Sequence, residues 1–389
     1  MKVLIFTTQF YQLGGAEQLA VELAKALNNG GIRADILSMY AEDLPGVPEA
    51  TKSFLKCGIP SIHFLCLRMR PPIMSLFLAI MKLRRLIVEE QYDIVETSLL
   101  GPTILASWAT LGTKARLVVG LHQVYSPDRE NSIQHNILKY SVQRNHGARY
   151  YAISDIAAEH WSKYAKIPAE HIRKIYNGIS MRFFSANPDR LGVRMEQGLH
   201  ADARIVIYVG RLAAYKGIDT LLNALAPILV KEDLFLFFVG LPDLHVNGTA
   251  KILQQMKLRI AKNLWGERVQ FLGFRNDVPR IMASADVLVD PTRMEGFGLC
   301  LVEAMAAGLP VVASNAEAIP EILLGTESMI VSPDDPNALR KAILKTLHRS
   351  PVESAKAVDA GRNRAEEFRM EKRVESMVRL FEDVLEGRF

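Results

Sequence analysis

Two stretches in the second half of the chain place charged side chains among glycines, each between an apolar run and an expected helix. The first is Gly210–Gly217, which contains Arg211 and Lys216. A planar guanidinium and a compact ammonium together suit a diphosphate group with two negative charges. The alternative is a pair of solvated surface cations, but the strand-to-helix position favours an anion-binding role.

The second stretch, Glu295–Glu303, follows an apolar run and leads into a helix of Leu, Val, Ala and Met. Its glycines free the backbone at the helix N-terminus, whose N–H groups can meet phosphate oxygens or hydroxyls. Glu303 lies about one turn into this apolar helix, so we expect a partly buried carboxylate that needs a hydroxyl or cation partner. A vicinal diol would satisfy it. The alternative is a first-turn glutamate that stabilises the helix dipole.

The first half of the chain contains two further candidates. Gly14 and Gly15 separate the first apolar run from a helix, so the backbone there could approach a ligand closely; a plain turn is the alternative. His122 follows the apolar run Leu117–Leu121, which places an imidazole at the carboxyl end of a strand, where α/β sheets bind ligands. A lone histidine is more often structural, but Gly120 leaves room beside it.

The elements that must position these residues follow a parallel α/β pattern. Short runs rich in Val, Ile and Phe alternate with amphipathic stretches along the whole chain, which is typical of βαβ units. We expect strands at Val3–Thr7, Ala34–Ser38, Ser61–Leu65, Asp93–Thr97, Leu117–Leu121, Tyr150–Ile153, Ile205–Val209, Leu234–Val239, Val269–Leu272, Val287–Asp290, Val311–Ala313 and Met329–Val331.

The strand pattern restarts after an unpatterned stretch at residues 185–202, which indicates two domains. Both halves open with an apolar strand and a glycine-containing turn into a helix, as nucleotide-binding α/β domains do. We therefore predict two Rossmann-like α/β domains, at 1–184 and 185–368, that face each other across a ligand-binding cleft. The remaining segment, 369–389, forms a last helix that could pack back on the first domain.

The composition excludes several classes of protein. With 389 residues, 49% of them hydrophobic and 23% charged, the chain resembles a soluble globular enzyme and not a disordered, collagen-like or coiled-coil protein. The net charge of +5 is spread over both halves. It gives no argument for nucleic acid, but it suits anionic substrates or an anionic membrane surface. No apolar run is long enough for a signal peptide or a membrane span.

Three cysteines, with no CxxC pair and no histidines at zinc spacing, predict a reducing, cytoplasmic compartment and no metal site. We expect these cysteines to be buried small hydrophobes. The apolar segment Ile73–Ile87 contains Lys82, Arg84 and Arg85 and would suit a peripheral membrane contact at the inner face of the membrane. Because this helix must also bury a face on the sheet, we favour core packing for most of its leucines.

In order and spacing, the motifs resemble the retaining glycosyltransferase family 4, whose members have the GT-B fold. The likeness extends over nearly the whole chain and rests on Gly14–Glu17, His122, Tyr176–Ile179, Gly210–Gly217, Gly240, Leu272–Phe274 and the two glutamates of Glu295–Glu303. The resemblance implies an N-terminal domain that binds the acceptor and a C-terminal domain that binds a nucleotide sugar. A UDP-sugar is the favoured donor, and a GDP-sugar is possible.

The resemblance also implies roles for single residues. Arg211 and Lys216 would bind the donor diphosphate, next to Gly210, and Glu303 would bind the ribose hydroxyls. Glu295 and the backbone amides of Phe297, Gly298, Leu299 and Cys300 would surround the transferred sugar. Gly14 and Gly15 would lie near the phosphates or the acceptor, and His122 would contact the donor sugar.

The function that we predict is a metal-independent retaining sugar transfer to a hydroxyl of a glycan or lipid-linked acceptor, in cell-surface polysaccharide biosynthesis. It needs no cofactor, since the nucleotide sugar is a substrate. Two alternatives stay open. A nucleotide-sugar epimerase or hydrolase of the same fold would need catalytic carboxylates, for which Glu295 and Glu317 are the candidates, and a non-catalytic sugar-nucleotide-binding protein would bind without turnover.

Overall fold

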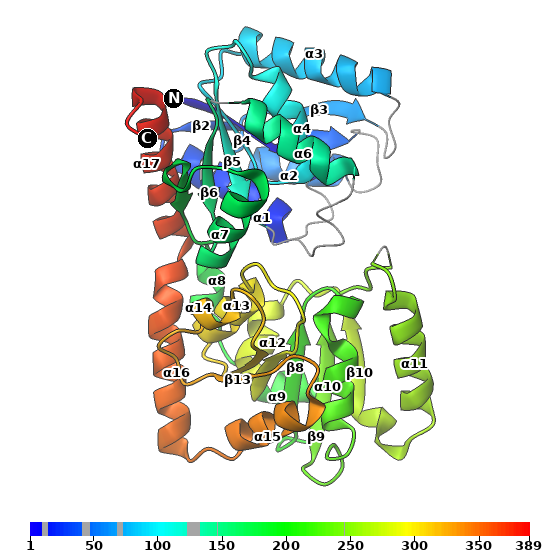
Figure 1. Cartoon of the computed structure of the whole chain (residues 1–389). Coiled ribbons are helices and arrows are strands. Elements are labelled where there is room, and N and C mark those ends of the chain that lie inside the picture. The colour runs from blue at the N-terminus through cyan, green and yellow to red at the C-terminus, as the bar shows by residue number, and fades with distance from the viewer. Residues whose placement is uncertain (10–14, 41–46, 68–72, 123–132, 146, 245) are drawn as a thin grey trace. The chain divides into compact units, whose positions relative to one another are not determined.

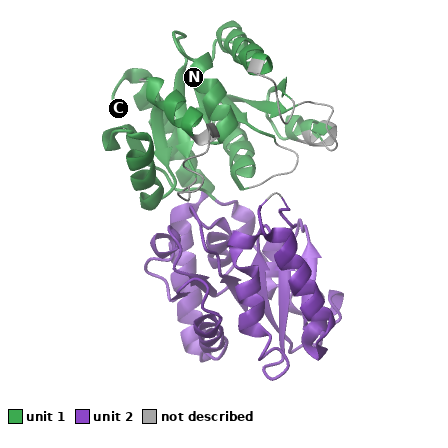
Figure 2. Cartoon of the chain, turned by 45° about the vertical axis from the view of Figure 1, so that its right-hand side comes forward, with its two compact units in different colours: residues 1–178, 370–389 green, residues 179–369 purple. Residues whose placement is uncertain are grey.

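The computed structural model describes residues 1–389 except 10–14, 41–46, 68–72, 123–132, 146 and 245. The described residues form two compact units, residues 1–178 with 370–389 (unit 1) and residues 179–369 (unit 2), shown in green and purple in Figure 2. The chain passes from unit 1 to unit 2 after Gly178 and returns after Arg369. The boundaries predicted from the sequence were after residues 184 and 368.

The described part of unit 1 contains a seven-stranded parallel sheet with the strand order β3-β2-β1-β4-β5-β6-β7 (Figure 1). The order changes direction between β1 and β4, where Val3 pairs with Ala34 on one side and with Ile94 on the other. The strands are β1 (Lys2–Thr7), β2 (Arg33–Tyr40), β3 (Ile62–Leu67), β4 (Ile94–Thr97), β5 (Arg116–Leu121), β6 (Arg149–Ala152) and β7 (Ile172–Lys174).

Amphipathic helices cover the sheet of unit 1. The last helix of the chain buries Met377, Leu380, Phe381 and Val384 and contacts the first helix and β5, so it belongs to unit 1. The described helices are α1 (Gly15–Asn29), α2 (Val47–Lys56), α3 (Ile73–Glu89), α4 (Leu100–Ala109), α6 (Ile133–Arg144), α7 (Asp155–Ala165), the 3₁₀ turn η1 (Ala169–His171) and α17 (Met370–Glu386).

The described part of unit 2 contains a six-stranded parallel sheet with the order β10-β9-β8-β11-β12-β13. Its order changes direction between β8 and β11. The strands are β8 (Arg204–Val209), β9 (Leu234–Val239), β10 (Val269–Gly273), β11 (Val287–Asp290), β12 (Val311–Ser314) and β13 (Met329–Val331).

One face of this second sheet packs on α10, α11 and α15, whose leucines meet the inward-facing residues of the strands, including Val206, Phe238 and Val289. The helical elements are α8 (Met181–Phe184), α9 (Arg190–Glu196), η2 (Ala214–Lys216), α10 (Ile218–Leu225), α11 (Thr249–Ala261), η3 (Leu264–Arg268), α12 (Val278–Ser284), α13 (Leu299–Ala306), α14 (Ile319–Ile322), α15 (Pro336–Leu347), α16 (Pro351–Ala365) and η4 (Glu366–Phe368).

The structure confirms the two-sheet α/β architecture, and every strand expected from the sequence overlaps an observed strand. The pattern did not predict β7, a three-residue edge strand, or α9, which lies in the unpatterned stretch at residues 185–202. The α9 helix has little apolar periodicity: it starts at the cap Asp189, whose carboxylate accepts from the Gly192 N–H over 3.0 Å, and it buries Val193 and the arginine Arg194.

Two expectations about surfaces were wrong. Cys57 and Cys66 are exposed rather than buried. Core packing explains only one face of α3, through Ala79, Leu83 and Ile87, while the other face exposes large apolar side chains. No helix among the described residues is long and apolar enough to cross a bilayer.

Candidate active site

The predicted site residues of unit 2 lie at the carboxyl ends of β8 and β11, where the strand order changes direction. The loop after β8 extends from Gly210 to Gly217, and the loop after β11 from Pro291 to Gly298. Open α/β sheets bind ligands beyond the carboxyl ends of their strands at such a switch point. The topology therefore brings together, at one edge, two motifs that are far apart in the sequence.

Gly217 allows these two loops to touch. Its φ of +64° lies in the left-handed region, and a Cβ added to it would stand 2.0 Å from the carbonyl oxygen of Pro291. Any larger residue would push the loops apart. The Arg293 N–H joins the loops by donating a 2.8 Å hydrogen bond to the Tyr215 carbonyl.

Lys216 and Glu295 form an ion pair between the two loops, in which the Lys216 ammonium donates to Oε2 of Glu295. Their side chains are only 14% and 17% exposed. Burial opposes the charge on Lys216, but Glu295 and Asp290 together raise its pKa well above the usual value. Burial likewise opposes the charge on Glu295, and Lys216 lowers its pKa. Both groups are therefore charged near neutral pH.

Glu317, which the sequence offered as an alternative catalytic carboxylate, holds the Glu295 segment in place. Its Oε2 accepts a 2.7 Å hydrogen bond from the Glu295 N–H, and the Ala318 N–H donates to the Glu295 carbonyl over 3.2 Å. Glu317 has a φ of +43°, a strained backbone for a residue with a side chain. Burial raises the pKa of Glu317. This arrangement makes Glu317 a support for the loop after β11.

Another carboxylate lies near the ion pair. Asp290 ends β11, is 2% exposed, and accepts a hydrogen bond from the Cys300 thiol, with 3.5 Å between Sγ and Oδ2. Burial raises the pKa of Asp290 to about 6, although Lys216 lowers it. Cys300 was predicted only for its backbone amide, and Asp290 was not predicted as a site residue. The available signal was a charged residue that closes an apolar strand.

Arg211 does not join Lys216 and Glu295. Its guanidinium donates to Asp243 over 2.6 Å and to the Tyr215 hydroxyl over 2.9 Å, and its side chain is 61% exposed. Tyr215 separates the two cations, because the Lys216 ammonium lies over its ring, 5.5 Å from the centroid. The structure thus assembles Lys216 with Glu295 and places Arg211 at the solvent-facing side of the same loop.

The start of α13 completes this edge of unit 2. Gly298 has a φ of +90° and precedes the helix, and as a glycine it offers no side chain to cap the first-turn amides of Leu299 and Cys300. Just before the helix, the Phe297 N–H donates to Oε1 of Glu295 over 3.3 Å. Phe297 is buried, with its ring edge-on to Phe368.

Glu303 is half-buried on α13, as predicted. Burial raises its pKa to about 7, and the nearby charge of Arg182 acts in the opposite direction.

At the other end of the β8 loop, Gly210 has a φ of +151° and lies beside Gly240, on which a Cβ would stand 2.0 Å from the Gly210 carbonyl oxygen. The ends of β8 and β9 thus also approach closely.

Arg293 is a site-supporting residue that the sequence analysis missed. Its Nε donates to Asp334 over 2.8 Å, a terminal nitrogen donates to Asp219 over 3.1 Å, and the other terminal nitrogen donates to the Ala214 carbonyl. One side chain therefore ties the loop after β11 to the start of α10. Only its position between a strand end and the Glu295 motif could have drawn attention to it.

In unit 1, Gly14 lies outside the described residues, and Gly15 is the first residue of α1. Glu17 in the first turn accepts a 3.0 Å hydrogen bond from the hydroxyl of Thr8, which directly follows β1. Since β1 and β4 flank the switch point of this sheet, Gly15 lies at the edge where ligands bind.

His122 directly follows β5 and is partly exposed. Its Nε2 lies 3.3 Å from the Tyr151 hydroxyl, and burial together with the charge of Arg373 lowers its pKa to about 3, so the ring is neutral. The interpretation of Gly120 was wrong. A Cβ on Gly120 would stand 2.5 Å from the Tyr151 hydroxyl oxygen, so the glycine makes room for that tyrosine and not for a ligand.

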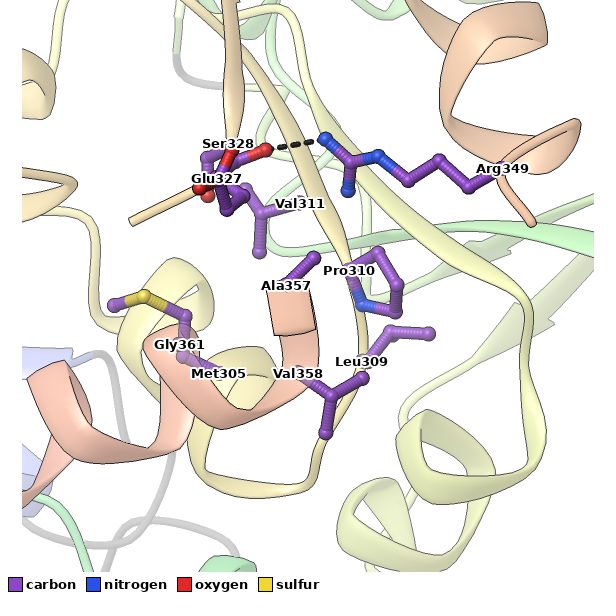
Figure 3. Close-up of a pocket in the computed structure, with 10 residues that line it drawn as sticks. All are labelled: Met305, Leu309, Pro310, Val311, Glu327, Ser328, Arg349, Ala357, Val358 and Gly361. Atoms are coloured by element: carbon purple, nitrogen blue, oxygen red, sulfur yellow. Dashed lines mark hydrogen bonds between the residues drawn. The ribbon is translucent and has the colours of Figure 1, made fainter. Parts of the chain in front are cut away.

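A pocket in unit 2 lies at the opposite, amino edge of the sheet, before β12 and β13 (Figure 3). Pro310 and Val311 line it on one side, and Arg349 donates a hydrogen bond across it to the Glu327 carbonyl. None of the predicted site residues lines it. Within the described ranges, no group of three or more His, Cys, Asp or Glu side chains could hold a metal ion.

The fold matches those of known glycosyltransferases. HepE of Anabaena, solved in complex with UDP, superposes with a TM-score of 0.83 at 22% identity, over 98% of this chain and 100% of HepE. Two family models match as well, "Glycosyltransferase Family 4" over residues 13–183 and "Glycosyl transferases group 1" over residues 203–349. The protein is therefore a glycosyltransferase of GT-B fold. It belongs to glycosyltransferase family 4, also called group 1.

Relatives match over different shares of their length. The N-acetyl-alpha-D-glucosaminyl L-malate synthase of Bacillus anthracis is 24% identical over 99% of this chain and 98% of its own. An uncharacterized glycosyltransferase of Methanocaldococcus jannaschii is 32% identical, but over 46% of each chain, so the chain spans about half of that protein. Lipopolysaccharide and O-antigen mannosyltransferases of Rhizobium meliloti and Escherichia coli are further relatives.

Proposed function

We propose that this glycosyltransferase moves a sugar from a nucleoside diphosphate sugar to a hydroxyl of a glycan or lipid-linked acceptor, with retention at the anomeric carbon. UDP is the favoured nucleotide, and GDP is the second choice. The observation that carries the proposal is the Lys216–Glu295 ion pair at the switch point of unit 2, beside the uncapped start of α13. It offers a fixed cation and the first-turn amides of a helix where a leaving diphosphate would develop charge.

The donor would lie across the loops after β8 and β11. Lys216 and the first-turn amides of α13 would hold the diphosphate, and Arg211 would turn from Asp243 toward it. Arg211 is 61% exposed but Asp243 only 14%, so the new contact with the diphosphate must offset the loss of a partner for a mostly buried carboxylate. Glu303, half-buried and close to its titration point, would accept hydrogen bonds from the two ribose hydroxyls.

The chemical step needs no protein nucleophile in this proposal. The bond between the anomeric carbon and the diphosphate oxygen breaks, and the acceptor oxygen bonds to the same face of that carbon. The departing phosphate oxygen takes the acceptor's proton. Lys216, Arg211 and the helix N-terminus stabilise the charge on the leaving group, so the transfer is metal-independent and uses no cofactor.

The relatives support the classes of donor and acceptor. HepE was solved with UDP and with UDP-glucose, and it shares the fold of this chain. Two relatives are a lipopolysaccharide core biosynthesis mannosyltransferase and an O-antigen chain mannosyltransferase. We propose the same acceptor class, a surface polysaccharide or its lipid-linked precursor, for this chain.

Thermal shift with UDP, GDP, ADP, dTDP and NAD tests the donor site. A ligand at 100 times its dissociation constant adds about 2.7 kcal/mol of stability. We expect one nucleoside diphosphate to stabilise the wild type and Lys231→Ala, a control at an exposed lysine of unit 2, but not Lys216→Ala or Glu303→Ala. Stabilisation by NAD alone, or equal stabilisation of all variants, would refute the site.

Reaction products test the chemistry separately. Incubation with the stabilising donor and a polysaccharide acceptor should give a product with the anomeric configuration of the donor, which NMR of the new linkage reports. Release of free sugar with no acceptor dependence would favour the hydrolase alternative. A product of inverted configuration would contradict the same-face step.

We also propose a peripheral membrane contact through α3 of unit 1. Met74, Phe77, Leu78 and Met81 follow helical spacing along one face and are 68%, 58%, 60% and 49% exposed. Exposed basic side chains flank this face, Lys82 and Arg85, of which Arg85 is 77% exposed. An apolar helix face beside basic residues suits the headgroup region of an anionic membrane, where a lipid-linked acceptor would be held.

Vesicle flotation tests this contact. We expect the wild type to float with phosphatidylglycerol-containing vesicles and Phe77→Ser/Leu78→Ser to stay in the soluble fraction. Leu264→Ser, which removes a 99% exposed leucine from unit 2, serves as the control and should float like the wild type. Equal flotation of all three proteins, or dimerisation of the wild type through α3 with no flotation, would contradict the proposal.

A further inference from the structure

A buried polar network lies beside His122 in unit 1. Glu96 from β4 and Tyr151 from β6 are 2% and 0% exposed, and Arg373 from α17 is 4% exposed. Glu96 and Arg373 are 55 and 222 positions from Tyr151 along the chain, yet both contact the Tyr151 hydroxyl. Burying a carboxylate, a phenol and a guanidinium together is costly unless each polar atom has a partner, so the hydrogen bonds of this network are informative.

The protons of the network can be assigned by counting. The Tyr151 hydroxyl donates to Oε1 of Glu96 over 2.7 Å, and the Ser98 hydroxyl donates to the same oxygen over 2.8 Å. The Arg373 guanidinium donates to the Tyr151 oxygen over 3.2 Å, because an arginine has no acceptor. Burial raises the pKa of Glu96, while the bonds from Tyr151 and Ser98 and the charge of Arg373 lower it. With Glu96 ionised, the single proton of Tyr151 goes to Glu96. The Ser98 hydroxyl oxygen also lies 3.2 Å from the Tyr151 oxygen, but its proton goes to Glu96, so the Tyr151 oxygen is an acceptor toward Arg373 and His122.

This count determines the tautomer of His122. Its Nε2 lies 3.3 Å from the Tyr151 oxygen, whose proton is already donated elsewhere. A hydrogen bond between the two atoms therefore requires a proton on Nε2. A neutral imidazole carries one ring proton, so Nδ1 of His122 is left as an acceptor.

Two features hold Tyr151 in this position. Gly120 on the neighbouring strand β5 leaves the space that the Tyr151 hydroxyl fills, since a Cβ there would stand 2.5 Å away. Arg373 is itself fixed by hydrogen bonds to Oδ1 of Asn177, at 2.9 Å, and to the Tyr176 carbonyl, at 3.2 Å. The neighbouring strand β5, through Gly120, and helix α17, through Arg373, therefore both fix the orientation of Tyr151.

We propose that Tyr151, held by Glu96 and Arg373, is a positioning residue that keeps His122 in the Nε2–H tautomer, so that Nδ1 accepts the hydrogen of a sugar hydroxyl. The tautomer follows from unit 1 alone, whereas the sugar as its partner rests on the proposed function. Without Tyr151, the ring could present an N–H to the same hydroxyl, with the wrong polarity.

The tautomer can be measured without any substrate. In the full-length protein labelled with ¹⁵N-histidine, the His122 signals are those lost in His122→Gln. Two-bond ¹H–¹⁵N correlation should show a protonated Nε2 and an unprotonated Nδ1 in the wild type. Tyr151→Phe should give a mixture of both tautomers. A wild type with a protonated Nδ1 would overturn the proposal, since it would mean that Glu96 donates and Tyr151 passes its proton to the histidine.

Tyr150→Phe is the matched control. Tyr150 precedes Tyr151 on β6, is 4% exposed, and donates its hydroxyl to the Val142 carbonyl over 3.2 Å, away from His122. It should lose a similar buried hydrogen bond and leave the tautomer unchanged. If Tyr151→Phe fails to fold, Glu96→Gln offers a second variant that keeps the shape of the network and weakens its hold on the Tyr151 proton. A mixture of His122 tautomers in Tyr150→Phe would also overturn the proposal.

Kinetics then test the consequence for the reaction. We expect Tyr151→Phe to lower kcat about tenfold or more with KM for the donor little changed, and the loss to disappear in a His122→Ala background, because Tyr151 acts through His122. Equal losses in both backgrounds would show a merely structural role. If no donor supports turnover, the proposed function fails, while the tautomer measurement still decides the positioning role.

Discussion

The candidate site residues of the two units differ in their charge and in their place in the fold. In unit 2, Lys216 and Glu295 are charged, come from loops at the carboxyl edge of the sheet, and are 14% and 17% exposed. In unit 1, Tyr151 and Glu96 are buried within strands, and His122 at the strand end is kept neutral, with its pKa lowered to about 3. Unit 2 is thus suited to bind a charged group, and unit 1 is suited to orient a neutral hydrogen-bonding side chain.

This difference indicates a division of work. Fixed cations stabilise a leaving group whose charge grows in the transition state, and they act most strongly where water is scarce. A neutral imidazole of fixed tautomer adds little charge, but it discriminates between a hydroxyl that donates and one that accepts. Rate should therefore depend mainly on unit 2, and the choice and orientation of the sugar on unit 1.

The largest expected effect is on the charged pair. Lys216→Ala removes the buried cation and should lower kcat/KM by about 10²–10³-fold, or about 3–4 kcal/mol of transition-state stabilisation, as the loss of one preorganised donor does elsewhere. Steady-state transfer assays would measure it. Wild-type turnover in Lys216→Ala would contradict the division between the two units.

Lys216→Ala also leaves Glu295 without its partner, so a fall in stability could imitate a catalytic loss. The variant Lys216→Ala/Glu295→Gln removes both charges and serves as the control, because breaking half of a buried pair is more destabilising than removing the whole pair. If this double variant regains stability but not activity, the loss of activity belongs to the Lys216–Glu295 pair and not to unfolding.

A pair of glycines tests whether loop contact in unit 2 is essential. Gly217 and Gly273 have the same φ of +64°, but a Cβ on Gly217 would stand 2.0 Å from the Pro291 oxygen, while one on Gly273 would have nothing within 4 Å. Gly273→Ala should cost about 1–2 kcal/mol for its backbone strain. Gly217→Ala should cost roughly 1–3 kcal/mol more, from overpacking.

Urea unfolding of the two alanine variants would give this difference. The nucleotide should also bind more weakly to Gly217→Ala than to Gly273→Ala, because separating the loops moves Lys216 away from Glu295. Equal stability and equal affinity would show that the two loops are not coupled through this contact.

The sequence was sufficient to predict the architecture because burial on both faces makes parallel strands into nearly continuous apolar runs. Val287–Asp290 and Leu234–Val239 are of this kind. The edge strand β7 was not predicted because its three residues, Ile172–Lys174, are half-buried or exposed and carry two charges. The α9 helix escaped because a buried arginine, Arg194, occupies a position where the pattern expects an apolar residue.

The candidate site residues also differ in whether a local sequence motif marks them. Lys216, Glu295 and Glu303 could be predicted because each stands beside glycines in a short contiguous motif, and topology then brings the motifs together. Tyr151 and Arg373 could not, because nothing local distinguishes a tyrosine in an apolar strand or an arginine in an amphipathic helix. Their meaning comes from a contact between residues 222 positions apart.

Gly120→Ala tests the orienting network of unit 1. The added Cβ would stand 2.5 Å from the Tyr151 oxygen and 2.8 Å from the Ser98 hydroxyl oxygen, so Tyr151 must shift, at a cost of about 1–2 kcal/mol. Gly147→Ala, whose Cβ would meet only ordinary contacts beyond 3.6 Å, is the control. Calorimetry should find nucleotide affinity unchanged in both, since unit 2 is intact. Weaker nucleotide binding in Gly120→Ala would break the distinction between the units.

The smallest expected effect is the pH dependence of Glu303, whose carboxyl is close to its titration point at neutral pH. Burial raises the pKa of its carboxyl from an ordinary 4.5 to about 7. The folded state therefore keeps a proton that the unfolded chain releases between these values. Accordingly, the contribution of Glu303 to stability decreases as the pH rises through that window.

Ligand binding should show the opposite trend. Above about pH 7 the ionised Glu303 accepts the ribose hydroxyls more strongly, by about 1 kcal/mol, which corresponds to an affinity about fivefold higher at pH 8 than at pH 6. Calorimetric titration of UDP into the wild type and Glu303→Gln at both pH values isolates this effect, because the ionisation of UDP itself is common to both proteins. The same pH dependence in both would place the ribose elsewhere, and unit 2 would then recognise its ligand through fixed charges alone.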